Sequence, residues 1–119
     1  MKVVILAGGL GTRIADHSDL PKPMIAINGK PIISHILEIF ISQGFNDFII
    51  AVGYKGNIIK KYFKKKFPKY KIKIVDTGTK TLTGNRIKKL KGYLTEENFM
   101  LTYGDGLCNV NLKKLLKFH

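Results

Sequence analysis

Residues 1–24 are MKVVILAGGLGTRIADHSDLPKPM, and this stretch decides the fold. Val3–Ala7 is an unbroken apolar run, rich in β-branched residues, that ends at a glycine. Such a run is typical of a strand buried on both faces of a parallel sheet. The glycines at positions 8, 9 and 11 let the backbone turn sharply and bring its N–H groups close to a ligand. The stretch therefore predicts a strand that opens into an anion-binding loop.

Polar side chains in the same stretch extend this prediction to a polyphosphate. Thr12 offers a hydroxyl and Arg13 a planar, permanently charged fork, and both suit phosphate oxygens. Lys22 lies between two prolines, which stiffen the backbone and present the ammonium from a nearly fixed position. A tight turn with an ordinary surface arginine and lysine explains the glycines equally well. The Pro-Lys-Pro segment favours the phosphate site.

Two other phosphate-binding motifs are excluded. A dinucleotide fingerprint that starts at Gly9 requires a glycine at position 14, which is Ile14. The P-loop ends in Gly-Lys-Ser or Gly-Lys-Thr, and neither triplet occurs in the sequence. The loop is therefore of another type.

Composition favours a globular cytoplasmic protein. The chain has 119 residues, enough for one domain or part of one, and 45% of them are hydrophobic. Cys108 is the only cysteine, so no internal disulfide forms, which fits a reducing compartment. The first apolar run is too short for a signal-peptide core, and no stretch is long enough to span a membrane. We therefore expect a cytoplasmic location and no membrane partner.

The net charge of +13 raises the hypothesis of a nucleic-acid partner. The only arginines are Arg13 and Arg86, whereas nucleic-acid-binding proteins usually contact bases and backbone through arginine. We therefore expect no nucleic-acid partner. The densest lysine run, from Lys60 to Lys73, is best explained as a solvated helix face that steers anionic nucleotides. An RNA-binding domain that uses this face remains the alternative.

Apolar periodicity predicts strands that alternate with helices. After the first strand, Asn28-Gly29 marks a tight turn, and Gly44 marks a helix end. The later predicted elements are a helix from Pro31 to about Gln43, a strand at 48–52, a helix at 57–67, a strand at 71–75, a loop at 76–84, a helix at 85–94, a strand at 99–103 and a helix from Leu112. This order predicts an α/β fold with a mostly parallel sheet and helices on both faces.

Four polar or glycine-rich loops directly follow predicted strands, at 8–13, 53–56, 76–84 and 104–106. Ligands of open parallel sheets bind beyond the carboxyl ends of the strands, so we expect these loops to form one site. Asp105, between two glycines, suits Mg²⁺, although a turn aspartate explains it equally well when taken alone. Asp76 is better explained by a structural loop role.

The motifs together resemble a known family. LAGGLGTR followed by PKPM resembles the sugar-nucleotide pyrophosphorylases, nucleotidyltransferases that join a nucleotide to a sugar 1-phosphate. GFNDFIIAVGYKG, VDTGTKTLTGNR and LTYGDG are most similar to the glucose-1-phosphate cytidylyltransferases. The resemblance implies a three-layer, Rossmann-like nucleotidyltransferase fold, with residues 1–119 as its N-terminal nucleotide-binding part. It also implies CTP and glucose 1-phosphate as substrates, CDP-glucose and pyrophosphate as products, and Mg²⁺ as the cofactor.

The resemblance also implies roles for residues. Arg13 and Lys22 are the expected catalytic residues, and Asp105 is the expected metal ligand. Thr81 and Arg86 match nucleotide-binding positions, although Thr83 beside them is also a candidate helix cap. The expected substrate-binding set is Leu6, Ala7, Gly8, Gly9, Leu10, Gly11, Thr12, Arg13, Lys22, Thr81, Arg86 and Gly104.

The chain departs from the family pattern in length. The segment between Arg13 and Pro21 and the segment from Phe63 to Lys71 are shorter than in the cytidylyltransferases, and Asn85 replaces a usual glycine. The family's sugar-binding residues and second metal-binding aspartate lie in a C-terminal half, so we expect a truncated domain. Two alternative functions therefore stay open: a nucleotide-binding module without turnover, and a sibling enzyme with another nucleotide or sugar. A homo-oligomer also stays open as the form of assembly.

Overall fold

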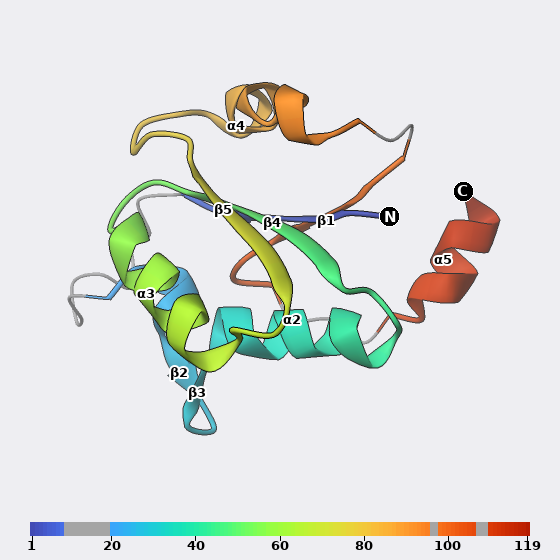
Figure 1. Ribbon diagram of the computed structural model, residues 1–119, viewed down its shortest axis with the longest axis horizontal. Helices are drawn as coiled ribbons and strands as arrows, with labels where there is room; N and C mark the ends of the chain where they lie inside the picture. Colours follow the sequence, from blue (N-terminus) through green and yellow to red (C-terminus); the bar gives the residue numbers. More distant parts are fainter. Residues whose placement is uncertain (9–19, 96–97, 107–109) are drawn as a thin grey trace.

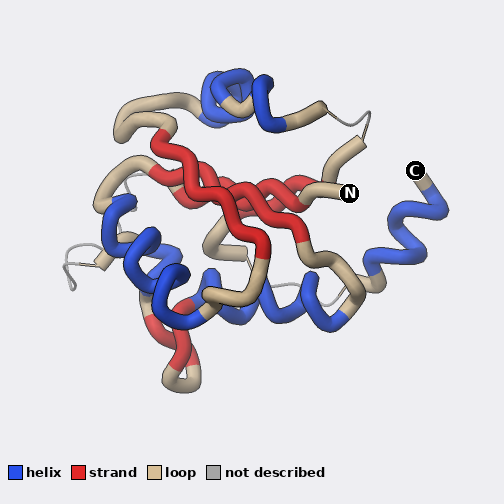
Figure 2. The backbone as a smooth tube through the Cα atoms, viewed as in Figure 1, coloured by secondary structure: helices blue, strands red, loops and turns tan. Residues whose placement is uncertain are grey.

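The computed structural model describes residues 1–8, 20–95, 98–106 and 110–119. Its centre is a parallel sheet of β1 (Val3–Ala7), β4 (Asp47–Val52), β5 (Lys71–Asp76) and β6 (Met100–Tyr103) in the order β5-β4-β1-β6. The strands run side by side through the middle of the molecule (Figure 2). The apolar run at the N-terminus is fully buried in β1, between β4 and β6, as its composition predicts.

Helices cover both faces of the sheet, so the expected three-layer α/β fold is confirmed. α2 (Ile32–Ser42) and α3 (Gly56–Lys66) lie on one face, and α4 (Thr83–Lys89) lies on the other (Figure 1). Alternation along β1 sends Val3 and Ile5 into the core with α2 and α3, and Val4 into the core with Leu90, just after α4. The lysines of α3 stay outside, whereas Ile59 and Phe63 are buried.

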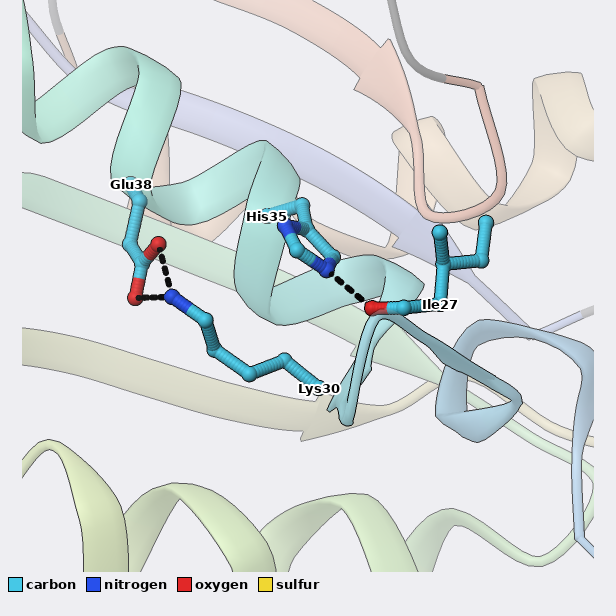
Figure 3. Close-up of polar contacts among 4 residues, drawn as sticks. All are labelled: Ile27, Lys30, His35 and Glu38. Atoms are coloured by element: carbon cyan, nitrogen blue, oxygen red, sulfur yellow. Dashed lines mark hydrogen bonds and ion pairs between the residues drawn. The ribbon is translucent and has the colours of Figure 1, made fainter.

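A small hairpin precedes α2 and is fixed to it. η1 (Lys22–Met24) leads into β2 (Ala26–Ile27) and β3 (Lys30–Pro31), and the turn residues Asn28 and Gly29 have φ values of 52° and 80°, as the Asn-Gly pair predicts. The His35 ring donates from Nε2 to the Ile27 carbonyl over 2.7 Å, and Lys30 Nζ contacts both Glu38 oxygens, at 2.9 and 3.1 Å (Figure 3). These contacts fix to α2 the hairpin that follows η1, the helix that carries Lys22.

Two helix boundaries differ from the expectation. The helix predicted at 85–94 begins at Thr83, ends at Lys89 and continues as the 3-10 helix η2 (Lys91–Tyr93), which contains Gly92, a weak helix former. Leu82, not Thr83, occupies the N-cap position, and no side chain caps the helix there. Pro31 precedes α2 rather than beginning it. At the C-terminus, α5 (Leu112–Phe118) is capped by Asn111, whose side chain accepts from the Lys114 amide over 3.1 Å.

Candidate active site

The carboxyl ends of β1 and β6, the helix η1 and the segment from Thr81 to Arg86 at the start of α4 surround a cavity of about 310 Å³. Its lining comes from four separate segments of the chain: Leu6, Ala7, Gly8, Lys22, Pro23, Thr81, Leu82, Thr83, Arg86, Tyr103 and Asp105. The volume lies at the lower end of the range for small-molecule sites. Of the four loops predicted to form one site, those at 8–13, 76–84 and 104–106 contribute described residues to this lining, whereas the loop at 53–56 does not.

An ion pair joins two sides of this cavity. Lys22 Nζ lies 2.9 Å from Asp105 Oδ2, and the two side chains are 40% and 33% exposed. An ion pair this open to solvent contributes about 0–1 kcal/mol to stability, because water screens it and both side chains lose freedom. Its value for the protein is therefore positional: it holds an ammonium and a carboxylate together beside the cavity.

The loop that carries Asp105 is fixed by its backbone. The Gly104 amide donates to the Leu6 carbonyl over 2.8 Å, which extends the pairing of β6 with β1 by one bond. A Cβ atom on Gly104 would lie 3.1 Å from Ala7 Cβ and 3.4 Å from Pro23 Cβ, so the fit leaves little room for a side chain. Glycine at this position lets Asp105 approach β1 and η1 closely.

Arg86 joins the loops that follow β1 and β5. Its side chain is buried, with the residue only 4% exposed. Nη1 donates to Thr77 Oγ1 and to the Gly78 carbonyl, each over 2.7 Å. Nη2 donates to the Gly8 carbonyl over 2.6 Å and to the Thr79 carbonyl over 3.3 Å. One guanidinium therefore sets the relative position of the two loops that form much of the cavity wall.

Burial and a neighbouring carboxylate act in opposite directions on this arginine. Desolvation lowers the pKa of Arg86, and the charge of Asp76 raises it. The pKa of arginine starts so high that the guanidinium keeps its charge at neutral pH. The bonds to Thr77 and the loop carbonyls are therefore charge-assisted, which makes them stronger than bonds between neutral groups.

Glycines make room for this arrangement. A Cβ atom on Gly8 would overlap the Arg86 guanidinium, and one on Gly53 would collide with the Gly8 and Gly78 carbonyl oxygens. Gly53 directly follows β4, so three strand ends approach one another at this point. The Thr77 hydroxyl donates to the Val52 carbonyl over 3.0 Å, which joins the ends of β4 and β5.

The structure brings most of the described residues predicted for the site to one place. Leu6, Ala7, Gly8, Lys22, Thr81, Arg86 and Asp105 line the cavity, and Gly104 packs behind them. Gly9, Leu10, Gly11, Thr12 and Arg13 lie outside the described residues. Thr81 is held by protein groups, since its hydroxyl donates to the Thr77 carbonyl and lies 3.3 Å from Lys89 Nζ.

Sequence reasoning missed several lining residues. Tyr103 is 56% exposed and pairs in register with Leu6, so the end of the β6 strand was the signal that could have found it. Leu82 is 75% exposed beside the cavity, and Pro23 was interpreted only as a stiffener of Lys22. Thr77 carries no sequence signal for its buried role, because its partners come from β4 and α4.

Metal ligands are few in this region. Within residues 1–8, 20–95, 98–106 and 110–119, no group of three or more His, Cys, Asp or Glu side chains is arranged to hold a metal ion. Asp105 is the one carboxylate that lines the cavity in that part of the chain. In the same residues, no helix is both long and apolar enough to cross a membrane.

The sequence matches a known family and its members. The nucleotidyl transferase family matches residues 2–119. A probable glucose-1-phosphate cytidylyltransferase of Bacillus subtilis is 43% identical over 141 residues, which cover all of this chain and 56% of the relative. A D-glycero-alpha-D-manno-heptose 1-phosphate guanylyltransferase of Campylobacter jejuni is 40% identical over 116 residues, which cover 97% of this chain and 52% of the relative.

A solved structure shows the same fold. The crystal structure of HddC from Yersinia pseudotuberculosis superposes with a TM-score of 0.86 at 34% identity, covering 98% of this chain and 53% of that one. The same protein is also known in complex with GMP-PN. The chain thus spans about half the length of the relatives it matches.

Proposed function

Because this chain belongs to the nucleotidyl transferase family, we propose that its cavity binds a nucleoside triphosphate for transfer to a sugar 1-phosphate. The pair of substrates that we propose is CTP and glucose 1-phosphate, giving CDP-glucose and pyrophosphate. Similarity over the whole chain to the Bacillus subtilis protein supports this pair. The observation that carries the proposal is Lys22, presented beside the cavity and held 2.9 Å from Asp105.

The proposed reaction is an in-line displacement at phosphorus. A phosphate oxygen of the sugar 1-phosphate forms a bond to the α-phosphorus of the triphosphate, the bond from that phosphorus to the bridging oxygen breaks, and pyrophosphate leaves with the electron pair. Such a transfer needs positioning and charge neutralisation more than covalent help from the protein. The Lys22 ammonium supplies positive charge to the reacting phosphate in this proposal.

Other residues hold the nucleotide in place. We propose that the backbone of residues 8–12 and the Arg13 side chain bind the triphosphate, and that Leu6, Ala7 and Thr81 face the base and ribose. Arg86, for which nucleotide contact remains a prediction, also contributes indirectly: its four hydrogen bonds run to protein groups and fix the Gly8 carbonyl at the start of the phosphate loop. The wall that meets the nucleotide is then preorganised rather than formed on binding.

Asp105 fits one ligand position of Mg²⁺. Its carboxylate is a hard oxygen donor, a third exposed and facing the cavity, and Mg²⁺ is usually bound by one or two carboxylates together with substrate phosphates. Bound there, the ion would neutralise phosphate charge and orient the triphosphate. Asp105 would share its two oxygens between the ion and Lys22.

A second candidate nucleotide is GTP. The alignments with the cytidylyltransferases are 141 and 143 residues long. This chain has only 119 residues, so these alignments contain gaps where the relatives have additional residues. The heptose 1-phosphate guanylyltransferase alignments extend over 116 and 120 residues and need almost no such gap. The α3-to-β5 connection, only residues 67–70, lies where the sequence predicts the missing segment.

A thermal-shift panel with CTP, UTP, dTTP, ATP and GTP, each with and without Mg²⁺, tests the proposal. A ligand that binds only the folded state raises its melting temperature. We expect the largest rise with CTP and Mg²⁺, whereas a larger rise with GTP would favour the second candidate. Binding without pyrophosphate release in the presence of sugar phosphate would favour a binding module, and no shift with any nucleotide would contradict the proposal.

A further inference from the structure

A groove of about 470 Å³ lies between α3 and the outer edge of β5 (Figure 1). It shares no residue with the cavity of the candidate active site. Its walls combine three aromatic side chains, from Phe63, Phe67 and Tyr70, with the lysines Lys60 and Lys64. The Phe67 ring lies 5.4 Å from the Phe63 ring and 5.9 Å from the Tyr70 ring, so the aromatic wall is continuous. The volume is within the range that ligand sites occupy.

The edge of β5 brings backbone groups to this groove. In the described part of the chain, β5 pairs only with β4. The Thr77 amide, just after β5, donates to the Val52 carbonyl over 2.8 Å and therefore points toward β4. Because backbone groups alternate in direction along a strand, the amides and carbonyls of Ile72 and Ile74 point away from β4. Both residues line the groove, which thus presents donors and acceptors at the spacing of a strand.

Lysines flank this edge on both faces of the sheet. Lys60 and Lys64 lie one turn apart on α3, on the groove side. Alternation along β5 places Lys71 and Lys73 on the opposite face. Among the described residues, only Lys71 of these four has a carboxylate partner, Asp47, whose Oδ2 lies 3.5 Å from the lysine Nζ. The edge therefore carries an excess of positive charge that other described groups leave unneutralised.

This charge pattern indicates which partner the edge accepts. A second copy of β5 would set lysines against lysines, and like charges that face each other across two strands are destabilising. A single-stranded RNA would use the lysines but not the strand-spaced backbone groups, and no arginine lines the groove among the described residues. An acidic strand satisfies both the charges and the backbone groups.

We propose that the groove between α3 and β5 is the docking site for an extended acidic segment of a partner protein. The segment adds a strand to β5, with its backbone bonded to Ile72 and Ile74. Its acidic side chains face Lys71 and Lys73, and its alternate, apolar side chains enter the aromatic groove beside the α3 lysines. The site is separate from the active-site cavity and does not depend on the proposed function.

The test titrates the 119-residue chain into a fluorescein-labelled synthetic peptide in which glutamate alternates with valine around one central phenylalanine. Fluorescence anisotropy measures the affinity. A second peptide carries lysine in place of every glutamate, and a third keeps the glutamates but replaces its valines with proline, which has no N–H to donate to a strand. A single-stranded RNA of equal charge is the fourth probe. Neither nucleotide nor turnover is needed, so failure here is distinct from failure of the proposed function.

We expect the alternating glutamate peptide to bind more tightly than the other three probes. Amide hydrogen exchange by NMR then tests the geometry of the complex. Exchange of the Ile72 and Ile74 amides should slow about tenfold or more when the peptide is bound, because they gain a partner. The Lys73 and Val75 amides, which point toward β4, should change little.

A pair of double variants separates the groove from general surface charge. Lys60→Glu with Lys64→Glu should weaken peptide binding about tenfold or more. Lys61→Glu with Lys65→Glu is the matched control, because it makes the same charge change at the same spacing on α3, with exposed residues that do not line the groove. Four results would overturn the proposal: no peptide binding, equal weakening by both double variants, binding of the RNA or the proline peptide as tight as that of the glutamate peptide, or binding that leaves the two outward amides unprotected.

Discussion

Lys22 and Asp105 lie 2.9 Å apart, although one belongs to η1 near the N-terminus and the other follows β6. The contact exists because Gly104 brings the β6 loop against Pro23 and Ala7. In the proposed site the two groups have opposite tasks, one toward phosphate and one toward Mg²⁺. The ion pair holds both groups beside the cavity and contributes little to the stability of the fold.

Lys22→Ala tests the phosphate role. The substitution removes an ammonium that is 40% exposed, so we expect the melting temperature to change by about 2 °C or less while nucleotide affinity falls about tenfold or more. Lys30→Ala is the control, because Lys30 makes a similar exposed ion pair with Glu38 at 2.9 Å, away from the cavity. A loss of stability that matches the loss of affinity would show that Lys22 is structural.

Asp105→Asn tests the metal role. The amide keeps the shape of the side chain but loses the charge that attracts both Lys22 and a divalent cation. We expect nucleotide binding, measured by titration calorimetry, to lose its dependence on Mg²⁺ and to keep its Mg²⁺-independent part. An unchanged Mg²⁺ dependence would place the metal ligand elsewhere in the chain.

Arg86→Ala tests the positioning role. The substitution leaves the Thr77 hydroxyl and the Gly8 carbonyl without their charged donor in a buried site, so we expect a loss of about 2–4 kcal/mol in the free energy of unfolding. Lys88→Ala on the exposed side of α4 should cost about 0.5 kcal/mol or less. Urea denaturation measures both variants, and equal effects would contradict the role of Arg86 in joining the loops.

Gly53→Ala tests the close approach of the three strand ends. The added methyl group meets the carbonyl oxygens of Gly8 and Gly78, so we expect about 1–3 kcal/mol of destabilisation. Gly92→Ala is the control, since a Cβ atom at that position meets nothing within 4 Å, and alanine in the η2 segment is expected to be neutral or stabilising. Similar melting temperatures for the two variants would argue against the tight packing.

Much of the fold follows from local sequence signals. Apolar runs and glycine ends predict all four strands of the parallel sheet, and Asn28-Gly29 predicts the hairpin turn. The order of the strands does not follow from them, because the placement of β1 between β4 and β6 depends on long-range pairing. The bounds of α4 were missed because Leu90, beyond its end, is fixed by packing against the sheet rather than by periodicity.

The site is only partly predictable for a similar reason. Lys22 and Asp105 were found because prolines and glycines mark them in the sequence, and the structure places both at the cavity. The family resemblance pointed to Arg86 as a nucleotide contact, a role that remains a prediction. Its bonds to Gly8, Thr77 and the neighbouring carbonyls could not be foreseen, since they join segments that are distant in the chain.

The most direct test of the central claim is an NMR map of CTP binding to the ¹⁵N-labelled chain in the presence of Mg²⁺. The account predicts that the largest amide shifts cluster at the cavity, at Gly8, Lys22, Thr81, Tyr103 and Asp105, and that they weaken in Lys22→Ala. Shifts that instead cluster on the lysine-rich face of α3, at Lys60 and Lys64, would contradict it, because the chain would then bind nucleotides through a general polyanion-binding surface.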